Sequence, residues 1–244
     1  YPYRDAAGLP FDDRDFAGTG TFPALDANIS FPYTPVVPPA ETNAKTPAWL
    51  NDPIYYHNRG NSTFAGENSL YGDFFGLDDL FTEHPAVVEG MINIHKYWID
   101  NFDIDGFRID TVKHVNAEFW REFTPAIMQA AQDAGRPEFY VFGEVYSSNP
   151  ELLSFYTTDP DMPGALDFRF QESVRSYVSG GGSAQNMQTL FANDDWFTDE
   201  DSNIYSLPTF VGNHDMGRFG YFLNSDNQGG LSDTEMLSRS KLAN

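Results

Sequence analysis

The sequence predicts an α/β fold in which parallel strands alternate with helices. From residue 85 onward, segments of strand character alternate with segments of helical periodicity. The strand centres lie near residues 104, 141, 166 and 209, roughly 35 residues apart, a spacing that suits a (β/α)₈ TIM barrel of about 250 residues. Periodicity does not distinguish this barrel from an open doubly wound sheet, which is the alternative. Its nucleotide-binding versions are disfavoured, because neither G-x-G-x-x-G after a strand nor G-x-x-x-x-G-K-[ST] occurs.

Apolar spacing predicts two long helices. The first begins near Pro85, and we expect one apolar face to pack into the core: Val87, Met91, Ile94 and Trp98. The second is expected over about residues 117–133, with Asn116 as its N-cap and Gly135 as its C-terminal stop. Shorter helices are expected over residues 171–179 and 184–192. Strands are expected at residues 102–112, 139–146, 164–168 and 206–215.

Residues 1–65 are rich in Pro, Gly, Asp and aromatic residues and have little periodicity, which predicts long loops. A compact domain rarely holds so much irregular chain unless it lines a functional site or forms a small inserted subdomain. The chain opens with YPYRDAAGLP, which contains neither an initiator Met nor a signal peptide. We therefore expect an N-terminal part to precede it.

The composition excludes several classes of function. The formal net charge is −22, with 36 acidic against 14 basic residues, so we expect neither a nucleic-acid partner nor an anionic membrane surface. The absence of cysteine excludes disulfides and thiol chemistry. No apolar run approaches the ~20 residues that span a bilayer.

Three predicted strands end in acidic residues: Asp110, Glu144 and Asp215. Taken singly, each acid could cap the helix that follows it. In a parallel barrel, however, the carboxyl ends of the strands converge on one face, and Arg108, His114 and His214 flank the acids. The pattern therefore predicts one shared site.

Several carboxylates on one face suit the cleavage of glycosidic bonds, which needs one protonated and one ionised carboxyl group. Arg108 lies two residues before Asp110 on the same strand face, so we expect it to lower the pKa of that carboxylate. Glu144 follows Gly143 and an apolar strand, surroundings expected to raise its pKa.

Three segments, "DGFRIDTVKH" (105–114), "GEVY" (143–146) and "FVGNHD" (210–215), resemble signature blocks of the alpha-amylase family of glycoside hydrolases. The resemblance implies Asp110 as the nucleophile, Glu144 as the general acid/base and Asp215 as a third acid that steadies the distorted sugar. It implies a retaining reaction through a covalent glycosyl-enzyme intermediate. It also implies substrate-binding residues: Arg108, Lys113, His114, His214 and Tyr146.

A fourth segment, "GLDDL" (76–80), is similar to a short motif of the same family in which an Asp helps to hold a structural calcium ion. By position, this implies Asp79 together with the backbone carbonyl of His114, and oxygen ligands suit Ca²⁺. The alternative is that Asp78 and Asp79 are ordinary loop or capping residues.

The chain departs from the family pattern in one respect. The earliest block of the family, an Asp and an Asn-His near the end of strand three, does not occur. The resemblance then makes residues 1–75 part of a loop-rich subdomain inserted after strand three, and residues 76–244 a barrel segment that holds strands four to seven. We accordingly expect an incomplete barrel, which would expose sheet edges that a closed barrel does not have.

The resulting expectation is an enzyme that cleaves alpha-1,4-glucosidic bonds in starch-like alpha-glucans or maltooligosaccharides. It is expected to be monomeric and either secreted or periplasmic. Transglycosylases and branching or debranching enzymes of the same family remain alternatives. So does a non-catalytic carbohydrate-binding or chaperone-like relative, although such proteins usually lose one of the acids.

Overall fold

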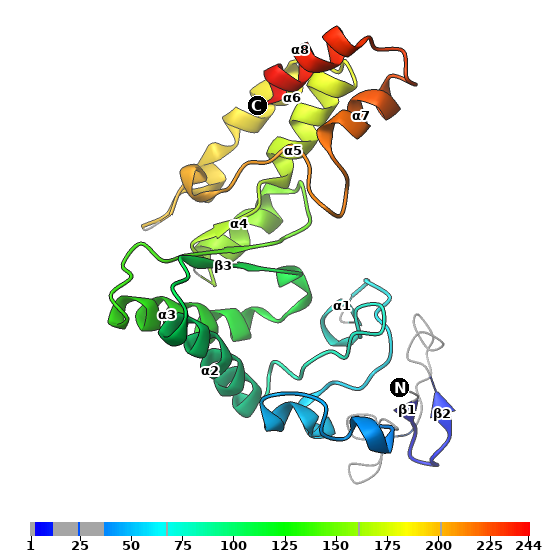
Figure 1. Cartoon of the computed structure of the whole chain (residues 1–244), viewed down its shortest axis with the longest axis vertical. Helices are drawn as coiled ribbons and strands as arrows, with labels where there is room; N and C mark the ends of the chain where they lie inside the picture. Colours follow the sequence, from blue (N-terminus) through cyan, green and yellow to red (C-terminus); the bar gives the residue numbers. More distant parts are fainter. Residues whose placement is uncertain (1–2, 12–23, 25–36, 67, 161, 201) are drawn as a thin grey trace. The chain divides into compact units, whose positions relative to one another are not determined.

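The computed structural model describes residues 3–11, 24, 37–66, 68–160, 162–200 and 202–244. The chain forms two compact units, coloured by sequence in Figure 1. The first unit comprises Tyr1–Asp103 and His114–Ala130, and the second comprises Ile104–Lys113 and Ala131–Asn244. The first unit therefore combines the loop-rich segment with two long helices. The domain boundary predicted at residue 75 stays a prediction.

The N-terminal part of the first unit consists of short elements joined by loops. Strands β1 (Tyr3–Arg4) and β2 (Pro10–Phe11) pair antiparallel over two residues each. One-turn elements follow: the 3₁₀ helices η2 (Pro39–Glu41), η3 (Ala48–Asn51) and η4 (Pro53–Tyr55), and the helix α1 (Asn68–Tyr71). Pro39 and Pro53 stand in the first turn of η2 and η4, where the missing backbone N–H costs no hydrogen bond.

Helix α2 (Pro85–Asn101) begins as predicted, with Pro85 in its first turn. His84 caps it, because its Nδ1 accepts a hydrogen bond of 3.1 Å from the backbone N–H of Ala86. The expectation that Trp98 packs into the core was wrong. This residue is 46% exposed, and its ring lies 4.7 Å from that of Phe102 on the surface of the unit.

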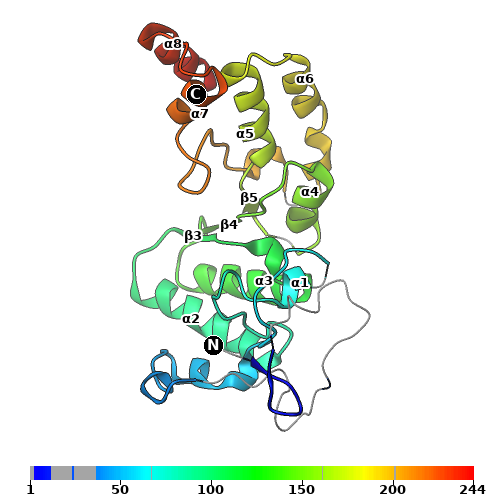
Figure 2. The same ribbon diagram turned by 90° about the vertical axis from the view of Figure 1, so that its right-hand side faces the viewer.

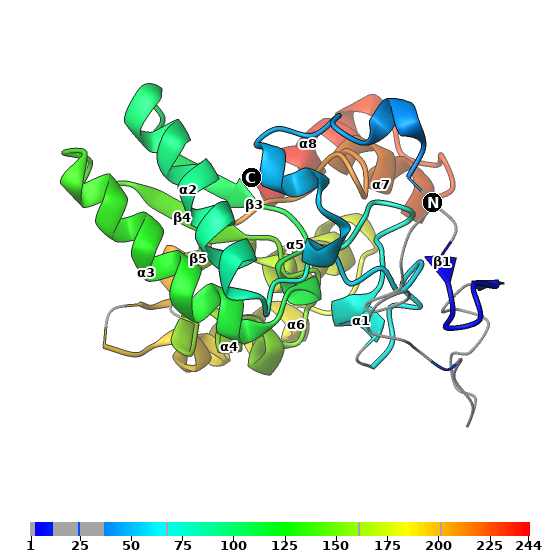
Figure 3. The ribbon, with the colours of Figure 1, turned by 90° about the horizontal axis from the view of Figure 1, so that it is seen from below.

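Helix α3 (Ala117–Asp133) has the predicted bounds and lies beside α2 (Figure 3). His95 of α2 meets Phe123 of α3 with their ring centroids 4.8 Å apart. The end of α3 is a Schellman motif at Gly135, whose φ is 78°, so the predicted stop is confirmed. Asn116 directly precedes the helix, and its Oδ1 accepts a hydrogen bond from the Thr82 hydroxyl at 2.8 Å, so its role as N-cap stays a prediction.

The second unit contains a parallel sheet with the strand order β3-β4-β5 (Figure 2). The strands are β3 (Gly106–Ile109), β4 (Tyr140–Gly143) and β5 (Gly164–Ala165). In the register of the sheet, Ile109 lies opposite Gly143. Because the strands are parallel, the residues that follow β3 and β4 emerge side by side at one edge. The predicted parallel βα arrangement is thus confirmed for these three strands.

The strand expected over residues 206–215 is not formed. Thr209 makes an isolated parallel bridge with Asp167, and the Asp167 N–H donates to the Pro208 carbonyl at 3.1 Å. Pro208 has no N–H with which to continue a ladder, which accounts for the interruption. The segment still runs parallel to the chain that leaves β5.

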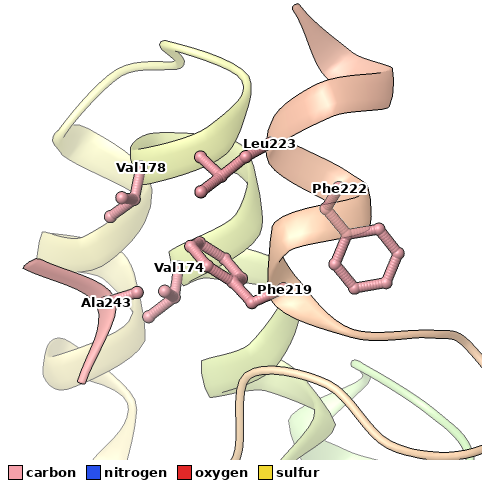
Figure 4. Packing of buried hydrophobic residues seen from close by; sticks show 6 residues of the cluster. All are labelled: Val174, Val178, Phe219, Phe222, Leu223 and Ala243. Carbon is pink, nitrogen blue, oxygen red and sulfur yellow. The ribbon is translucent and has the colours of Figure 1, made fainter. Parts of the chain in front are cut away.

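Helices complete the second unit. They are α4 (Pro150–Thr158), α5 (Phe168–Val174), the π-helical turn η6 (Arg175–Ser179), α6 (Gln185–Ala192), the 3₁₀ turns η7 (Asp194–Phe197) and η8 (Ile204–Ser206), α7 (Phe219–Asp226) and α8 (Asp233–Ala243). A buried cluster joins α5, η6, α7 and α8 (Figure 4): Val174, Val178, Phe219, Phe222, Leu223 and Ala243. Of the helices in the described ranges, none has both the length and the apolar character needed to cross a membrane.

An ion pair between η6 and α7 predicts a pH-dependent stability. Arg175 donates to both carboxylate oxygens of Asp226, at 3.1 and 2.9 Å, and these hydrogen bonds lower the pKa of Asp226. We expect Asp226→Asn to lower the free energy of unfolding by about 1 kcal/mol at neutral pH, a value reduced for the partial exposure of Arg175.

The sign follows from the lowered pKa. The stabilisation is complete above the pKa of an unfolded Asp, about 3.9, and disappears as the pH falls below it towards the lower folded value. Urea unfolding from pH 7 downward checks this, with the exposed Glu138→Gln as control. A destabilisation by Asp226→Asn that stays constant through this range would contradict it.

Candidate active site

Arg108 links two of the predicted catalytic carboxylates. Its Nη1 donates to Asp110 Oδ1, and its Nη2 lies 3.4 Å from Glu144 Oε1. Asp110 follows β3 and Glu144 follows β4, and the parallel register places them next to each other. The sequence predicted the contact between Arg108 and Asp110 but not the second contact, which joins residues from neighbouring strands.

The two carboxylates have different surroundings. The Asp110 side chain is 61% exposed, whereas that of Glu144 is only 9% exposed. Glu144 Oε2 also accepts a hydrogen bond of 3.2 Å from the backbone N–H of Thr111. Thr111 has a φ of 51°, a conformation that β-branched residues rarely adopt. Thr111 was not predicted as a site residue, since no local pattern marks a backbone donor.

Gly143 lets the end of β4 pack closely against the side chains of the core. A Cβ at this position would lie 2.5 Å from Met162 Sδ and 2.7 Å from Val112 Cγ2. Only glycine therefore allows this close approach without a shift of its neighbours. The backbone also holds Glu144 directly, because its N–H donates to the Ile109 carbonyl at 2.7 Å and its carbonyl accepts from the Val112 N–H at 3.0 Å.

Lys113 and Tyr146 form a second predicted pair. Lys113 Nζ donates to the Tyr146 carbonyl at 2.9 Å and lies 5.7 Å from the centroid of the Tyr146 ring. The ring is supported from behind by Phe168, at 4.8 Å between centroids. Tyr146 is nevertheless 55% exposed, so one part of its surface is open to a ligand.

Asp215 and His214 lie in a tight turn. His214 Nε2 lies 3.3 Å from Asp215 Oδ2, and both side chains are more than half exposed. Asn213 Oδ1 holds the turn by accepting hydrogen bonds of 3.0 Å from the N–H groups of Asp215 and Met216. Within the residues that the structure describes, Asp215 makes no hydrogen bond or ion pair with Asp110 or Glu144.

The structure places the two candidate calcium ligands in different surroundings within the first unit. Asp79 Oδ2 lies 2.6 Å from His57 Nδ1, and His114 Nδ1 lies 3.0 Å from the Ser69 carbonyl. The described ranges contain no group of three or more His, Cys, Asp or Glu side chains that could hold a metal ion. The predicted site combines the Asp79 side chain with the backbone carbonyl of His114, so the calcium ion stays a prediction.

His57 joins two acidic side chains. Its Nδ1 contacts Asp79, and its Nε2 lies 2.8 Å from Glu83 Oε2. Burial alone would lower the pKa of His57, but the hydrogen bonds to Asp79 and Glu83 raise it. Burial raises the pKa of Asp79 to about 6 despite its contact with His57. The three side chains therefore connect the loop before α2 through a polar network in which His57 is buried and both acids are partly exposed.

Comparison with known proteins finds one matching family and several similar enzymes. Residues 10–242 match the family model described as alpha amylase, catalytic domain. The chain is 50% identical to an alpha-amylase of Streptomyces lividans over 245 residues, which is all of this chain and 26% of that protein. It is 29% identical to a cyclomaltodextrin glucanotransferase of Geobacillus stearothermophilus, over 84% of this chain and 28% of that protein.

Solved structures give the same result. An alpha-amylase of Geobacillus thermoleovorans, solved with acarbose, superposes with a TM-score of 0.66 at 29% identity, over 80% of this chain and 42% of that chain. An Anoxybacillus alpha-amylase has the same TM-score and identity and is covered to 41%. The chain thus spans about a quarter of the curated relatives reported above and about two fifths of these structures.

Proposed function

The chain belongs to the alpha-amylase catalytic domain family, and on this premise we propose that it carries the catalytic centre of a retaining glycoside hydrolase. The proposed reaction is the cleavage of alpha-1,4-glucosidic bonds in starch-like glucans or maltooligosaccharides. The observation that carries the proposal is the contact of Arg108 with both Asp110 and Glu144 at adjacent strand ends.

The roles follow from the surroundings of each carboxylate. Asp110 is exposed and bound by a guanidinium, which suits an ionised nucleophile. Its carboxylate attacks the anomeric carbon while Glu144 gives a proton to the leaving glycosidic oxygen. Glu144 then takes a proton from water, which breaks the covalent intermediate and returns both carboxyl groups to their starting states. The Thr111 N–H and Arg108 hold the Glu144 carboxyl group in place.

The remaining predicted residues are proposed to bind sugar. Tyr146 offers an exposed ring on which a pyranose can stack, and Lys113 borders it. Asp215 and His214 are proposed to hold hydroxyl groups of the sugar at the cleavage point, and their exposed side chains leave them free to do so. His114 is proposed to border the leaving-group side.

The larger organisation is also proposed from the family. The parallel strands β3, β4 and β5 would form part of a TIM barrel, and the loop-rich segment would be a subdomain inserted after its third strand. A structural calcium ion, a secreted or periplasmic location and a monomeric state are proposed on the same basis. A loss of thermal stability in EDTA that calcium reverses would support the ion.

Transglycosylation is the second candidate, because cyclomaltodextrin glucanotransferases are among the relatives. Both activities share the covalent intermediate and differ in whether water or a sugar hydroxyl receives the glycosyl group. A non-catalytic relative is less well supported, since all three acids are present.

Incubation with soluble starch tests the proposal. We expect new reducing ends, and proton NMR of the first products should show the alpha anomer, because two displacements retain the configuration. Products that first appear as the beta anomer would overturn the assignment of Asp110 as a nucleophile. Cyclic or lengthened products without new reducing ends would favour the glucanotransferase alternative.

A further inference from the structure

Met216 directly follows Asp215 in a tight turn of the second unit, residues 213–217, called here the Asp215 turn. Asn213 Oδ1 accepts hydrogen bonds of 3.0 Å from the N–H groups of both residues. The Asn213 carbonyl accepts a further hydrogen bond of 3.0 Å from the Gly217 N–H, which closes the turn. Because Asp215 and Met216 share one acceptor, a displacement of Met216 would also displace Asp215.

The Met216 side chain connects the Asp215 turn to the core of the second unit. It is partly buried and packs against the cluster of α5, η6, α7 and α8 that Figure 4 shows. His214 and Asp215, by contrast, have side chains that are 70% and 53% exposed. Of these three consecutive residues, Met216 is the one that packs against the cluster. Since protein interiors are densely packed, a change in the shape or polarity of this side chain is expected to move the turn.

A small reactant can reach Met216, because this residue also lines a cavity with a volume of about 420 Å³. The wall of the same cavity includes Tyr146, which is 55% exposed, so solvent enters the cavity. One water molecule takes up about 30 Å³ in the liquid. Hydrogen peroxide is larger than water by a single oxygen atom, and the cavity therefore has room for it beside the Met216 thioether.

Methionine supplies all the sulfur of this chain, because the sequence contains no cysteine. Of the six methionines, Met216 is the one that adjoins a predicted catalytic residue in the sequence. Met162 is fully buried, and Met187 and Met236 pack against the same cluster from α6 and α8. Oxidation turns a flexible apolar methionine into a polar sulfoxide and disrupts the packing around it. At Met216, that change would act directly on the Asp215 turn.

We propose that Met216 is an oxidation site through which hydrogen peroxide controls the position of Asp215. The sulfur lone pair attacks one peroxide oxygen, the O–O bond breaks, and the other oxygen leaves as water after taking up the proton of the first. The thioether loses two electrons and becomes a sulfoxide, while the peroxide is reduced. Methionine sulfoxide reductases reverse the change with electrons from thiols, which become disulfides as the sulfoxide oxygen leaves as water.

The modified side chain is expected to leave the cluster, because burying a polar group without a hydrogen-bond partner is unfavourable. The Asp215 turn would then lose its contact with the core, and Asp215 would shift with it. Since a misplacement of about 1 Å can cost about 100-fold in rate, we expect kcat on soluble starch to fall by about 10- to 100-fold. The oxidation itself is independent of the proposed function, whereas this effect on kcat rests on it.

Treatment of the whole chain with hydrogen peroxide tests the proposal. Peptide mass spectrometry measures the oxygen gained by each methionine, and the cleavage of soluble starch is measured at the same time points. We expect kcat to fall in step with the oxidation of Met216. It should recover after incubation with a methionine sulfoxide reductase and dithiothreitol.

Two leucine variants identify the methionine responsible. Met216→Leu conserves the apolar volume and removes the sulfur, so this variant should cleave starch before the treatment and keep its activity throughout. The matched control is Met236→Leu, which replaces a partly buried methionine that packs against the same cluster. The control should lose its activity as quickly as the unsubstituted chain.

Met216→Gln tests the site without any oxidant. Glutamine is similar in length to methionine sulfoxide, polar and uncharged, so it imitates the oxidised side chain. We expect this variant to keep the circular dichroism of the unsubstituted chain and to show a kcat about tenfold lower or less.

The site would be overturned by complete oxidation of Met216 at unchanged kcat, by a loss of activity that spares Met216, or by an unchanged kcat in Met216→Gln. Equal peroxide sensitivity of Met216→Leu and the unsubstituted chain would also overturn it. If the untreated chain cleaves no starch, the proposed function fails instead. The mass spectra and the melting temperature then still decide the site, because peroxide should lower the melting temperature of the unsubstituted chain more than that of Met216→Leu.

Discussion

Replacing Glu144 with glutamine is expected to reduce kcat on soluble starch by about 10²- to 10⁴-fold, the usual contribution of a general acid/base. Glutamine has nearly the same shape, and its carbonyl oxygen can still accept the hydrogen bond from the Thr111 N–H. The amide cannot give a proton to the leaving oxygen. The loss should therefore appear in kcat and leave the fold unchanged, which circular dichroism and the melting temperature would check.

The leaving group supplies the sharper measurement for Glu144. In an aryl maltoside whose phenol is strongly acidic, the phenolate can leave without being protonated. The formation of the covalent intermediate from this substrate should therefore be nearly unaffected by Glu144→Gln. A burst of the phenol followed by slow turnover is expected, because the second step still lacks its base. Equal losses on starch and on the activated substrate would argue that Glu144 positions the substrate and does not transfer the proton.

Asp110→Asn is expected to reduce kcat by about 10⁴-fold or more, on activated aryl maltosides as well as on starch. The covalent bond to the anomeric carbon forms at this carboxylate, and an improved leaving group does not replace a nucleophile. The substituted side chain would also be uncharged, so Arg108 would lose one of its two carboxylate partners. The melting temperature of this variant should change only slightly, since the Asp110 side chain is largely exposed.

Added azide distinguishes the two substituted enzymes by stereochemistry. In Asp110→Asn, azide attacks the substrate directly from the free face and should give the beta-glycosyl azide. In Glu144→Gln, azide attacks the covalent intermediate and should give the alpha-glycosyl azide. Proton NMR of the azide products reads this difference. The same anomer from both variants would contradict the assigned roles.

Elements with strong local signals were predictable from the sequence. Helix α3 has its predicted bounds because its apolar spacing and Gly135 act within a few residues of one another. The parallel order of β3, β4 and β5 also follows from alternating patterns along the chain. Where a local signal was broken, the prediction failed, as over residues 206–215, where Pro208 interrupts the ladder.

The sequence by itself therefore determined which acids follow β3 and β4, because the alternation of side chains along a strand is a local property. Only the tertiary structure decided how they are connected. The contact of Arg108 with Glu144, the left-handed Thr111 that donates to the same carboxylate, and the pairing of His57 with Asp79 all join residues far apart in the chain. Such contacts depend on strand register and on the exclusion of water, and neither is encoded in any short segment.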